Sequence, residues 1–366
     1  MKAAIVTQPN QTPTYDDFED PAAQDGCELI SVTASALFPL TKARAAGSHS
    51  SSPGLFPMVV GVDGVGTTHS GQRVYFCMPA APFGGMAEKT LVPTANCVVL
   101  PEDLDDVRAA ALANPGMSSV AALKTRADLR RGDTVLVNGA TGAAGTLAVQ
   151  LAKHLGAGKV IATGRDAAAL QRVAGLGADV TISLLDDPQD VEDALVGQFG
   201  GDGVDVILDY LYGQWAETLL AAIGRMRGIT RPIRYVSIGA VSGQQITLAS
   251  AVMRGAPLAL MGSGIGSAPW KDFISAAGEA LHAAQPARLH IDTTPIPLAK
   301  RQPDMEHQHR EIPGCLRDEI ATLTISCPCC QRFPKIAPLG FMGFKSVSQR
   351  IGFADKPGDF CGFGSW

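Results

Sequence analysis

The stretch GDTVLVNGATGAAGTLAVQLAKHLGA, residues 132–157, decides the fold. An apolar strand at Thr134–Asn138 leads into a turn that holds Gly139, Gly142 and Gly145, and a helical pattern follows. Glycines allow a tight turn and let the backbone approach a pyrophosphate, whose charge suits the N–H groups at a helix N-terminus. Such a triplet alone is often only a turn, but its place between a strand and a helix predicts a dinucleotide site.

The segments on either side of this motif predict two kinds of domain. After about residue 132, apolar strands such as KVIATG, VDVILDYL and IRYVSIGA alternate with helical runs rich in Ala and Leu. This alternation predicts an α/β fold with a doubly wound, parallel sheet. Before it, short β-rich runs are divided by Gly, Pro, Asn and Asp, which predicts an irregular, mostly antiparallel, barrel-like domain.

The composition is that of a globular enzyme. The chain has 366 residues, of which 46% are hydrophobic and 18% charged, and its net charge is −5. That charge gives no field for binding nucleic acid, and the apolar runs are shorter than the roughly 20 residues that cross a bilayer. Only Cys27, Cys77 and Cys97 precede residue 300, a spacing typical of reduced thiols. We therefore expect a cytoplasmic protein without a membrane or nucleic-acid partner.

The end of the second strand indicates which dinucleotide binds. An acidic residue there would bind the ribose 2′-hydroxyl of NAD, but this chain has Thr163 and Gly164, followed by Arg165. The Arg165 guanidinium suits a 2′-phosphate, so NADP(H) is favoured over NAD. The rival acid, Asp166, fits better as the N-cap of the next helix. An arginine on a surface loop can also be simply solvated.

A later strand end suits the nicotinamide. In YVSIGA, the small residues Ser237 and Gly239 would let the ring lie against the backbone. Ligands of parallel α/β sheets collect at this edge, although the same residues also fit an ordinary strand end.

Seven ordered pieces together resemble the zinc-independent quinone oxidoreductases, the zeta-crystallin-like branch of the medium-chain dehydrogenase/reductase superfamily. The similarity runs from Met1 to about Leu298. The pieces are MKAAIV, PMVVGVDGVG with GQRVYF, PFGGMAEKTLVP, ALANPGMSSVAAL, VNGATGAAG, KVIATGR and YVSIGA.

This resemblance implies a domain plan and an activity. It implies a GroES-like catalytic domain over residues 1–113, an NADP-binding Rossmann domain over 114–265 and a return to the catalytic domain over 266–299. Hydride transfer from NADPH to a small-molecule quinone, or to an electron-poor alkene or carbonyl, is the implied reaction, commonly in a homodimer.

The resemblance also implies which residues would contact the cofactor. The residues for the pyrophosphate are Asn138, Gly142, Ala143, Ala144 and Gly145. Thr163, Gly164 and Arg165 would hold the adenosine phosphate, and Ser237 and Gly239 the nicotinamide end. Asn114, Met117 and Ser118 would lie beside the domain junction, near the cofactor.

No metal is expected. Zinc-dependent members carry a GHE motif where this chain has Gly61-Val62-Asp63, and ALFPL stands where their upstream Cys ligand would be. Val62 cannot bind a metal, and Asp63 alone fits a turn or an interdomain polar contact better. Near the position of the structural zinc lobe, only Cys97 is present.

The sequence identifies no catalytic residue. Family members often carry Asn and Asp in the loop that matches ALFPLTKARAAG, and this loop has neither. Thr41, Lys42, Arg44 and Tyr75 are the polar candidates, and each also fits a structural or solvent-facing role. A second class therefore stays open: a cofactor-binding protein without turnover, crystallin-like or responsive to nucleotides.

The tail over residues 300–366 departs from the family pattern. It lacks a sustained helical or strand period and contains five of the eight cysteines. We predict no regular structure in it, and a reading-frame slip would explain the change. In that case the last strand of the catalytic domain would be missing and would leave an unpaired sheet edge. An evolved extension is the alternative. Cys327 and Cys330 form only half of a zinc-knuckle pattern.

Overall fold

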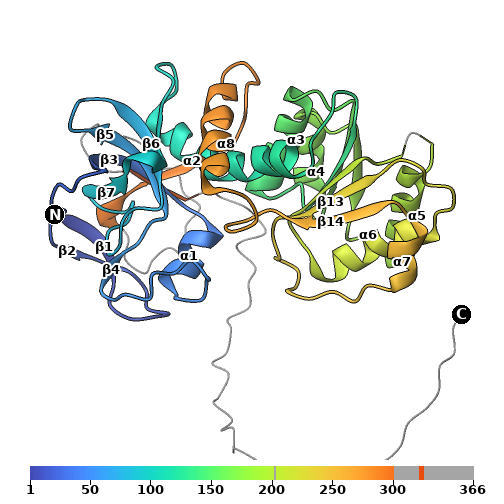
Figure 1. Ribbon diagram of the computed structural model, residues 1–366, viewed down its shortest axis with the longest axis horizontal. Coiled ribbons are helices and arrows are strands. Elements are labelled where there is room, and N and C mark those ends of the chain that lie inside the picture. The colour runs from blue at the N-terminus through green and yellow to red at the C-terminus, as the bar shows by residue number, and fades with distance from the viewer. Residues whose placement is uncertain (202, 301–320, 325–366) are drawn as a thin grey trace, which may run out of the picture. The chain divides into compact units, whose positions relative to one another are not determined.

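The computed structural model describes residues 1–201, 203–300 and 321–324. It contains three sheets (Figure 1). Two are built mainly from strands of the N-terminal half, and the third is the parallel sheet that the glycine motif predicts.

A six-stranded parallel sheet in the order β11-β10-β9-β12-β13-β14 forms the Rossmann part. Its strands are β9 (Thr134–Asn138), β10 (Lys159–Gly164), β11 (Val180–Ser183), β12 (Val206–Asp209), β13 (Ile233–Ser237) and β14 (Leu258–Gly262). Its helices are α3 (Ala143–His154), α4 (Ala167–Gly175), α5 (Pro188–Phe199), α6 (Gly213–Arg225) and α7 (Ser250–Gly255).

Alternate side chains of this sheet enter two separate cores. Val135 and Val137 of β9 pack in the cluster that contains residues of α3 and α4, whereas Leu136 packs in the cluster that contains residues of α5 and α6. Figure 1 shows helices on both faces of the sheet. A strand buried on both faces needs a continuous apolar run, which is the pattern that the sequence has here.

The N-terminal half is built on a three-stranded sheet, β2-β1-β4, and a seven-stranded sheet in the order β15-β16-β3-β5-β6-β8, in which β7 also pairs with β3. The strands from this half are β1 (Lys2–Val6), β2 (Thr14–Asp17), β3 (Cys27–Leu37), β4 (Met58–Val59), β5 (Asp63–Thr68), β6 (Arg73–Cys77), β7 (Lys89–Pro93) and β8 (Cys97–Val99). Short helices α1 (Pro39–Ala45) and η1 (Thr94–Asn96) lie between them. The predicted fold class, a Rossmann sheet with a mostly antiparallel, barrel-like domain, is confirmed.

Two helices from distant parts of the sequence pack together. Helix α2 (Asp106–Val120) continues into the π-helical η2 (Ala121–Arg126) and packs against α8 (Trp270–Ala283) and α3. The predicted domain boundary, between residues 113 and 114, falls inside α2. Arg108 at the start of this helix donates to the carbonyl of Leu289 at 2.7 Å, which fixes α2 to the segment after α8.

The end of the chain corrects one expectation. We predicted no strand after Lys300, yet Ala321–Thr324 forms β16, which pairs with β15 (Thr294–Pro297) on one side and in parallel with β3 on the other. β15 leads into η3 (Leu298–Lys300). The backbone of four residues is enough to fill this place in the sheet, a signal too short for periodicity to detect. The other tail residues, including Cys327 and Cys330, lie outside the described part of the chain.

Candidate nucleotide and substrate site

The predicted cofactor residues meet at the carboxyl edge of the parallel sheet. Thr163 is opposite Asn138, which is opposite Asp209, which is opposite Ser237, so four neighbouring strands end at one level. The chain runs from β9 to β10 on one side and from β12 to β13 on the other side of the sheet. The carboxyl ends of β9 and β12 therefore form the switch point where α/β sheets bind ligands.

The glycine turn after β9 has the geometry that a dinucleotide needs. Gly139 has φ +88°, in the left-handed region. A Cβ on Gly145 would lie 2.2 Å from the carbonyl oxygen of Gly139, so only glycine lets α3 start this close to the strand. Gly142 is the N-cap of α3 and no side chain caps it, which leaves the first-turn N–H groups for a ligand. The residues present therefore fit a pyrophosphate.

Buried side chains hold this turn from below. The Asn138 amide donates to Asp209 Oδ1 at 2.8 Å, and the Thr163 hydroxyl donates to Asn138 Oδ1 at 2.7 Å while it accepts from the Gly139 N–H at 3.2 Å. Asp209 also accepts from the Tyr235 hydroxyl at 2.6 Å and is fully buried. These bonds connect β10, β9, β12 and β13, so they fix the edge on both sides of the switch point.

This network changes how two predicted residues are understood. The side chains of Asn138 and Thr163 are 1% and 0% exposed, and their polar atoms are engaged within the protein. They position the turn, and their direct contact with a cofactor stays a prediction. Sequence reasoning missed Asp209 and Tyr235. The signal was an acid at the end of the buried strand VILD, which an apolar strand would otherwise exclude.

The end of β10 has one exposed cation. Gly164 is buried, and a Cβ there would lie 2.4 Å from the Thr141 side chain, so the backbone packs tightly against the glycine turn. Arg165 follows and is exposed. Asp166 caps α4 by accepting from the Ala169 N–H at 2.8 Å, which confirms its predicted role as an N-cap.

The end of β13 is half-buried. Ser237 and Gly239 are both partly exposed, and a Cβ on Gly239 would lie 2.6 Å from the carbonyl oxygen of Tyr210. Glycine therefore lets the chain after β13 pass close to the chain after β12. Whether nicotinamide lies here stays a prediction.

Helix α2 connects the glycine turn to the N-terminal half. Its Ser119 hydroxyl lies 3.0 Å from the Tyr210 hydroxyl and 3.3 Å from the carbonyl of Ala144, in the first turn of α3. Just before it, Met117 is buried and Ser118 is partly exposed. Burial raises the pKa of Tyr210 to about 12, so this phenol stays protonated at neutral pH.

Earlier in α2, Asn114 lies beside a buried carboxyl. Asp63 on β5 is 0% exposed, and its Oδ2 accepts from the Tyr75 hydroxyl at 3.0 Å. Burial raises the pKa of Asp63 from 3.8 to about 7, against the opposing effect of hydrogen bonding from Tyr75 and Asn114. Its Oδ1 has no hydrogen bond of normal geometry. Asp63 is thus a polar contact to α2, one of the two roles that the sequence left open, and it lies in strand β5 rather than in a turn.

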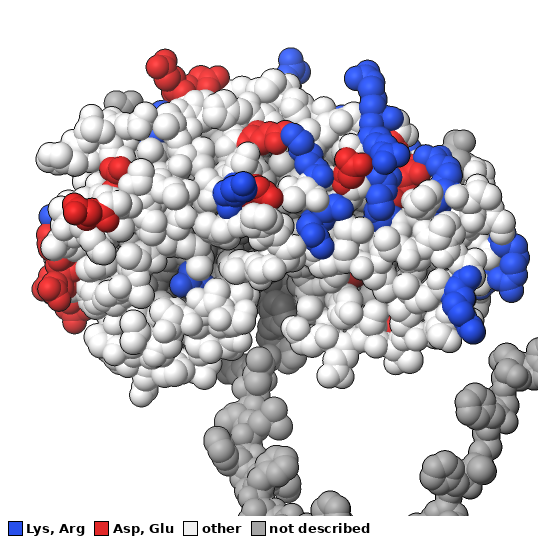
Figure 2. Space-filling model, in the orientation of Figure 1, with Lys and Arg blue, Asp and Glu red and all other residues white. Residues whose placement is uncertain are grey.

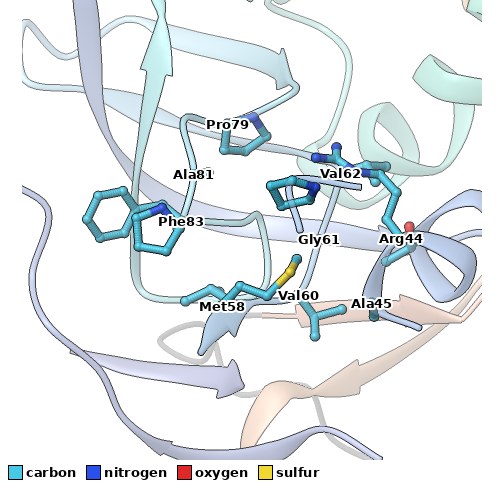
Figure 3. Close-up of a pocket in the computed structure, with 13 residues that line it drawn as sticks. Arg44, Ala45, Met58, Val60, Gly61, Val62, Pro79, Ala81 and Phe83 are labelled. Atoms are coloured by element: carbon cyan, nitrogen blue, oxygen red, sulfur yellow. The ribbon is translucent and has the colours of Figure 1, made fainter. Parts of the chain in front are cut away.

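Beside Asp63, the preceding residues line a pocket of about 350 Å³, including the part that is open to solvent (Figure 3). Gly61, Val62 and Phe83 are among its mostly apolar lining residues, and Arg44 reaches it from α1. Of the other sequence candidates in α1, Thr41 is buried with its hydroxyl near the Phe38 N–H, and Lys42 is exposed. Arg44 is therefore the one cation among the residues that line this pocket.

Neither a metal cluster nor a membrane span is found in the part of the chain that the structure describes. In the described ranges, no three His, Cys, Asp or Glu side chains are grouped as a metal site would require. Within those ranges, no helix has the length and apolarity to span a membrane. Figure 2 shows basic and acidic side chains sharing one part of the face, with large uncharged areas elsewhere.

Comparison with known families gives a match that begins at α3 of the Rossmann part and ends within α8. Residues 143–279 match a family described as zinc-binding dehydrogenase. This range excludes Val62 and Asp63, so the match carries no information on the position where a catalytic zinc would bind.

Among curated proteins, a probable NADPH-dependent quinone reductase of Emericella nidulans is 30% identical over 75% of this chain and 87% of its own length. A 2-haloacrylate reductase of a Burkholderia species is 33% identical over 47% of this chain and 54% of its own length.

Solved structures show the same fold. The quinone oxidoreductase of Thermus thermophilus, also solved with NADPH, has a TM-score of 0.67 and 26% identity, and the match covers 82% of this chain and 93% of that one. A mycobacterial quinone oxidoreductase has a TM-score of 0.71 at 22% identity, and the match covers 89% of this chain and 100% of that one.

Proposed function

We propose, for a chain that belongs to the quinone oxidoreductase branch of the medium-chain dehydrogenase/reductase superfamily, that it is an NADPH-dependent reductase of a quinone or an electron-poor alkene. The observation that carries this proposal is the glycine turn at the switch point, held by the Asn138–Asp209 hydrogen bond. The relatives named for NADPH, quinones and haloacrylate support the cofactor and the class of acceptor.

Each part of the edge has a proposed task. The α3 N-terminus, with Gly142, Ala143, Ala144 and Gly145, binds the pyrophosphate through its N–H groups. Arg165 binds the 2′-phosphate, because its fork of donors is exposed at the end of β10. Ser237 and Gly239 border the nicotinamide. When bound, NADPH supplies the hydride that reduces the acceptor.

We propose that the reaction needs no zinc. Val62 stands where zinc-dependent relatives have a histidine ligand, and the pocket beside it is lined mainly by apolar side chains. The protein then contributes orientation and exclusion of water, and the developing charge on the acceptor is stabilised by hydrogen bonds. No side chain is assigned as an essential proton donor.

We further propose a cytoplasmic homodimer with the domain limits given above. Strand β14 is the edge of the parallel sheet, and Leu260 on it is 38% exposed. An exposed apolar edge strand pairs readily with a second copy. Light scattering of the purified full chain would give twice the monomer mass, and a monomer at micromolar concentration would contradict this part of the proposal.

The test of the function uses the purified full chain with NADPH and a panel of quinones and enones. We expect loss of absorbance at the reduced nicotinamide band with at least one acceptor, and slower loss with NADH. Binding of NADPH without consumption by any acceptor would favour the alternative, a cofactor-binding protein without turnover.

A further inference from the structure

The pocket beside Val62 contains a cation without an anionic partner. The buried Nε of Arg44 has no hydrogen-bond partner within the described residues, and its Nη1 contacts only the weak acceptor Sδ of Met78, at 2.9 Å. No ion pair involving Arg44 is found among those residues, where other arginines such as Arg73 and Arg234 have carboxylate partners. A buried donor of this kind is costly unless a ligand satisfies it.

Nearby groups do not neutralise this charge. Burial alone lowers the pKa of Arg44, and no carboxylate contributes to that shift. The neighbouring His49 has its pKa lowered by burial and by Arg44, which indicates that the local field is positive. Helix α1 has no acidic residue in its first turn, and Lys42 adds another cation to its last turn.

A structural role for Arg44 accounts for part of this arrangement. A cation in the last turn of a helix stabilises the helix dipole. Lys42 provides the same effect from an exposed position in that turn. The dipole therefore does not require that the Arg44 guanidinium reach an apolar pocket, where its desolvation is unfavourable.

We propose that Arg44 binds the carboxylate of a compact α,β-unsaturated acid, so that the preferred acceptor of the reductase is a 2-alkenoate. This proposal rests on the proposed function. A guanidinium pairs with both oxygens of a carboxylate, and the apolar lining, including Val62 and Phe83, suits a short hydrocarbon chain. The lining encloses little space, which favours a small acid over a polycyclic quinone.

The chemistry balances with the proposed cofactor. The β carbon of the alkenoate gains a hydride from NADPH, the C=C π bond breaks, and the α carbon gains a proton from water; the products are the saturated acid and NADP⁺. A free carboxylate donates electron density to the double bond and slows hydride addition. Pairing with Arg44 withdraws that density and makes the alkene electron-poor.

The first experiment needs no variant. But-2-enoate and its methyl ester differ hardly in shape, and the ester is intrinsically the better hydride acceptor, so a higher kcat/KM for the acid with the wild-type full chain would report recognition of the charge. We expect at least about a tenfold preference for the acid, since a charge-assisted hydrogen bond contributes about 1.5–3 kcal/mol. If quinones or the ester are reduced with a kcat/KM equal to or higher than that of the acid, this inference is overturned and the proposed function stays intact.

The second experiment compares two charge-removing variants of one helical turn. Arg44→Gln should lower the ratio of kcat/KM for acid over ester by about 10- to 100-fold, whereas Lys42→Gln should leave the ratio and both rates unchanged. Arg44→Lys should recover part of the preference. An unchanged ratio in Arg44→Gln would overturn the inference, and thermal unfolding of each variant shows that folded protein is compared.

A binding measurement separates the inference from turnover. Calorimetry with butanoate and methyl butanoate, without NADPH, should show binding of the acid to wild type and at least about tenfold weaker binding to Arg44→Gln. Failure of the acid to bind would overturn the inference even if quinones are reduced. If the acid binds but none of the acceptors causes NADPH to be consumed, the reductase function fails while the carboxylate site stands.

Discussion

The carboxyl edge of the parallel sheet and the pocket beside Val62 differ in whether their buried polar groups have hydrogen-bond partners. At the edge, Asn138, Thr163, Asp209 and Tyr235 satisfy one another. At the pocket, Arg44 Nε is buried and lacks a hydrogen-bond partner of normal geometry among the described residues, and the same holds for Oδ1 of Asp63, which follows the lining residue Val62. The first region is complete before any ligand binds, and the second is not.

This difference indicates where each ligand obtains its affinity. A dinucleotide meets a backbone turn that is already fixed, so little ordering cost accompanies its binding. In the proposed pocket, a substrate would meet Arg44, whose Nε has no partner among the described residues, so the substrate's own polar groups would decide how well it binds. Enzymes with this arrangement could keep one cofactor and reduce different acceptors, because the two ligands depend on separate groups.

The largest expected effect is that of Gly145→Ala, which disrupts the packing of α3 against the turn after β9. The new Cβ would lie 2.2 Å from the carbonyl of Gly139, so the strand and α3 must separate. We expect NADPH to bind at least about 100-fold more weakly, about 3 kcal/mol, by fluorescence titration. The matched control is Gly175→Ala in α4, where nothing lies within 4 Å. Equal NADPH affinity in both variants would contradict the assignment of the turn.

The next effect tests the network beneath the turn. Asp209→Ala removes the acceptor of the N–H groups of Leu211 and Tyr212 and of the Asn138 amide, and leaves these buried or partly buried donors without a partner. We expect a loss of about 3–4 kcal/mol in the free energy of unfolding, by denaturant titration. Tyr235→Phe removes a single hydrogen bond and should lose about 1–2 kcal/mol. Similar losses in the two variants would argue against Asp209 as the centre of the network.

Asp63, next to the pocket, should make the stability of the protein depend on pH. Its pKa is raised from 3.8 to about 7 in the folded protein, so the folded state holds the proton more tightly than the unfolded state. Its contribution to stability is complete below about pH 4 and is lost as the pH rises through about 7. Relative to Asp63→Asn, wild type should lose about 2–3 kcal/mol between about pH 5 and pH 8. Parallel pH profiles for the two proteins would refute this.

The smallest expected effect concerns the exposed rim of the edge. Arg165→Gln should weaken NADPH binding about tenfold and leave NADH binding within about twofold, because only NADPH carries the 2′-phosphate. Arg172→Gln in α4 removes an exposed charge farther along that helix and serves as the control. If both variants weaken NADPH binding equally, the general charge of the surface rather than a phosphate contact explains the preference for NADPH over NADH.

The Rossmann part was predictable from the sequence because its determinants are local. The apolar run at Thr134–Asn138, the glycine spacing and the Asp166 cap each depend on a few neighbouring residues. The Asn138–Asp209 bond joins residues 71 positions apart: the acid at the end of VILD marks Asp209, but nothing within either strand indicates which residue it contacts. The same holds for Arg44, whose isolation depends on which side chains surround it after folding. β16 was missed because its place is set by pairing with β3 and β15.

Transfer of deuterium from NADPH tests the central claim most directly. NADPH labelled at each C4 position in turn would be mixed with the full chain and an accepted alkene, whose reduction places the label in a C–D bond that does not exchange with water, and the product analysed by mass spectrometry. The account predicts one deuterium per reduced molecule from one of the two labelled forms. Binding of NADPH with no deuterium in any product, from either form, would contradict a reductase.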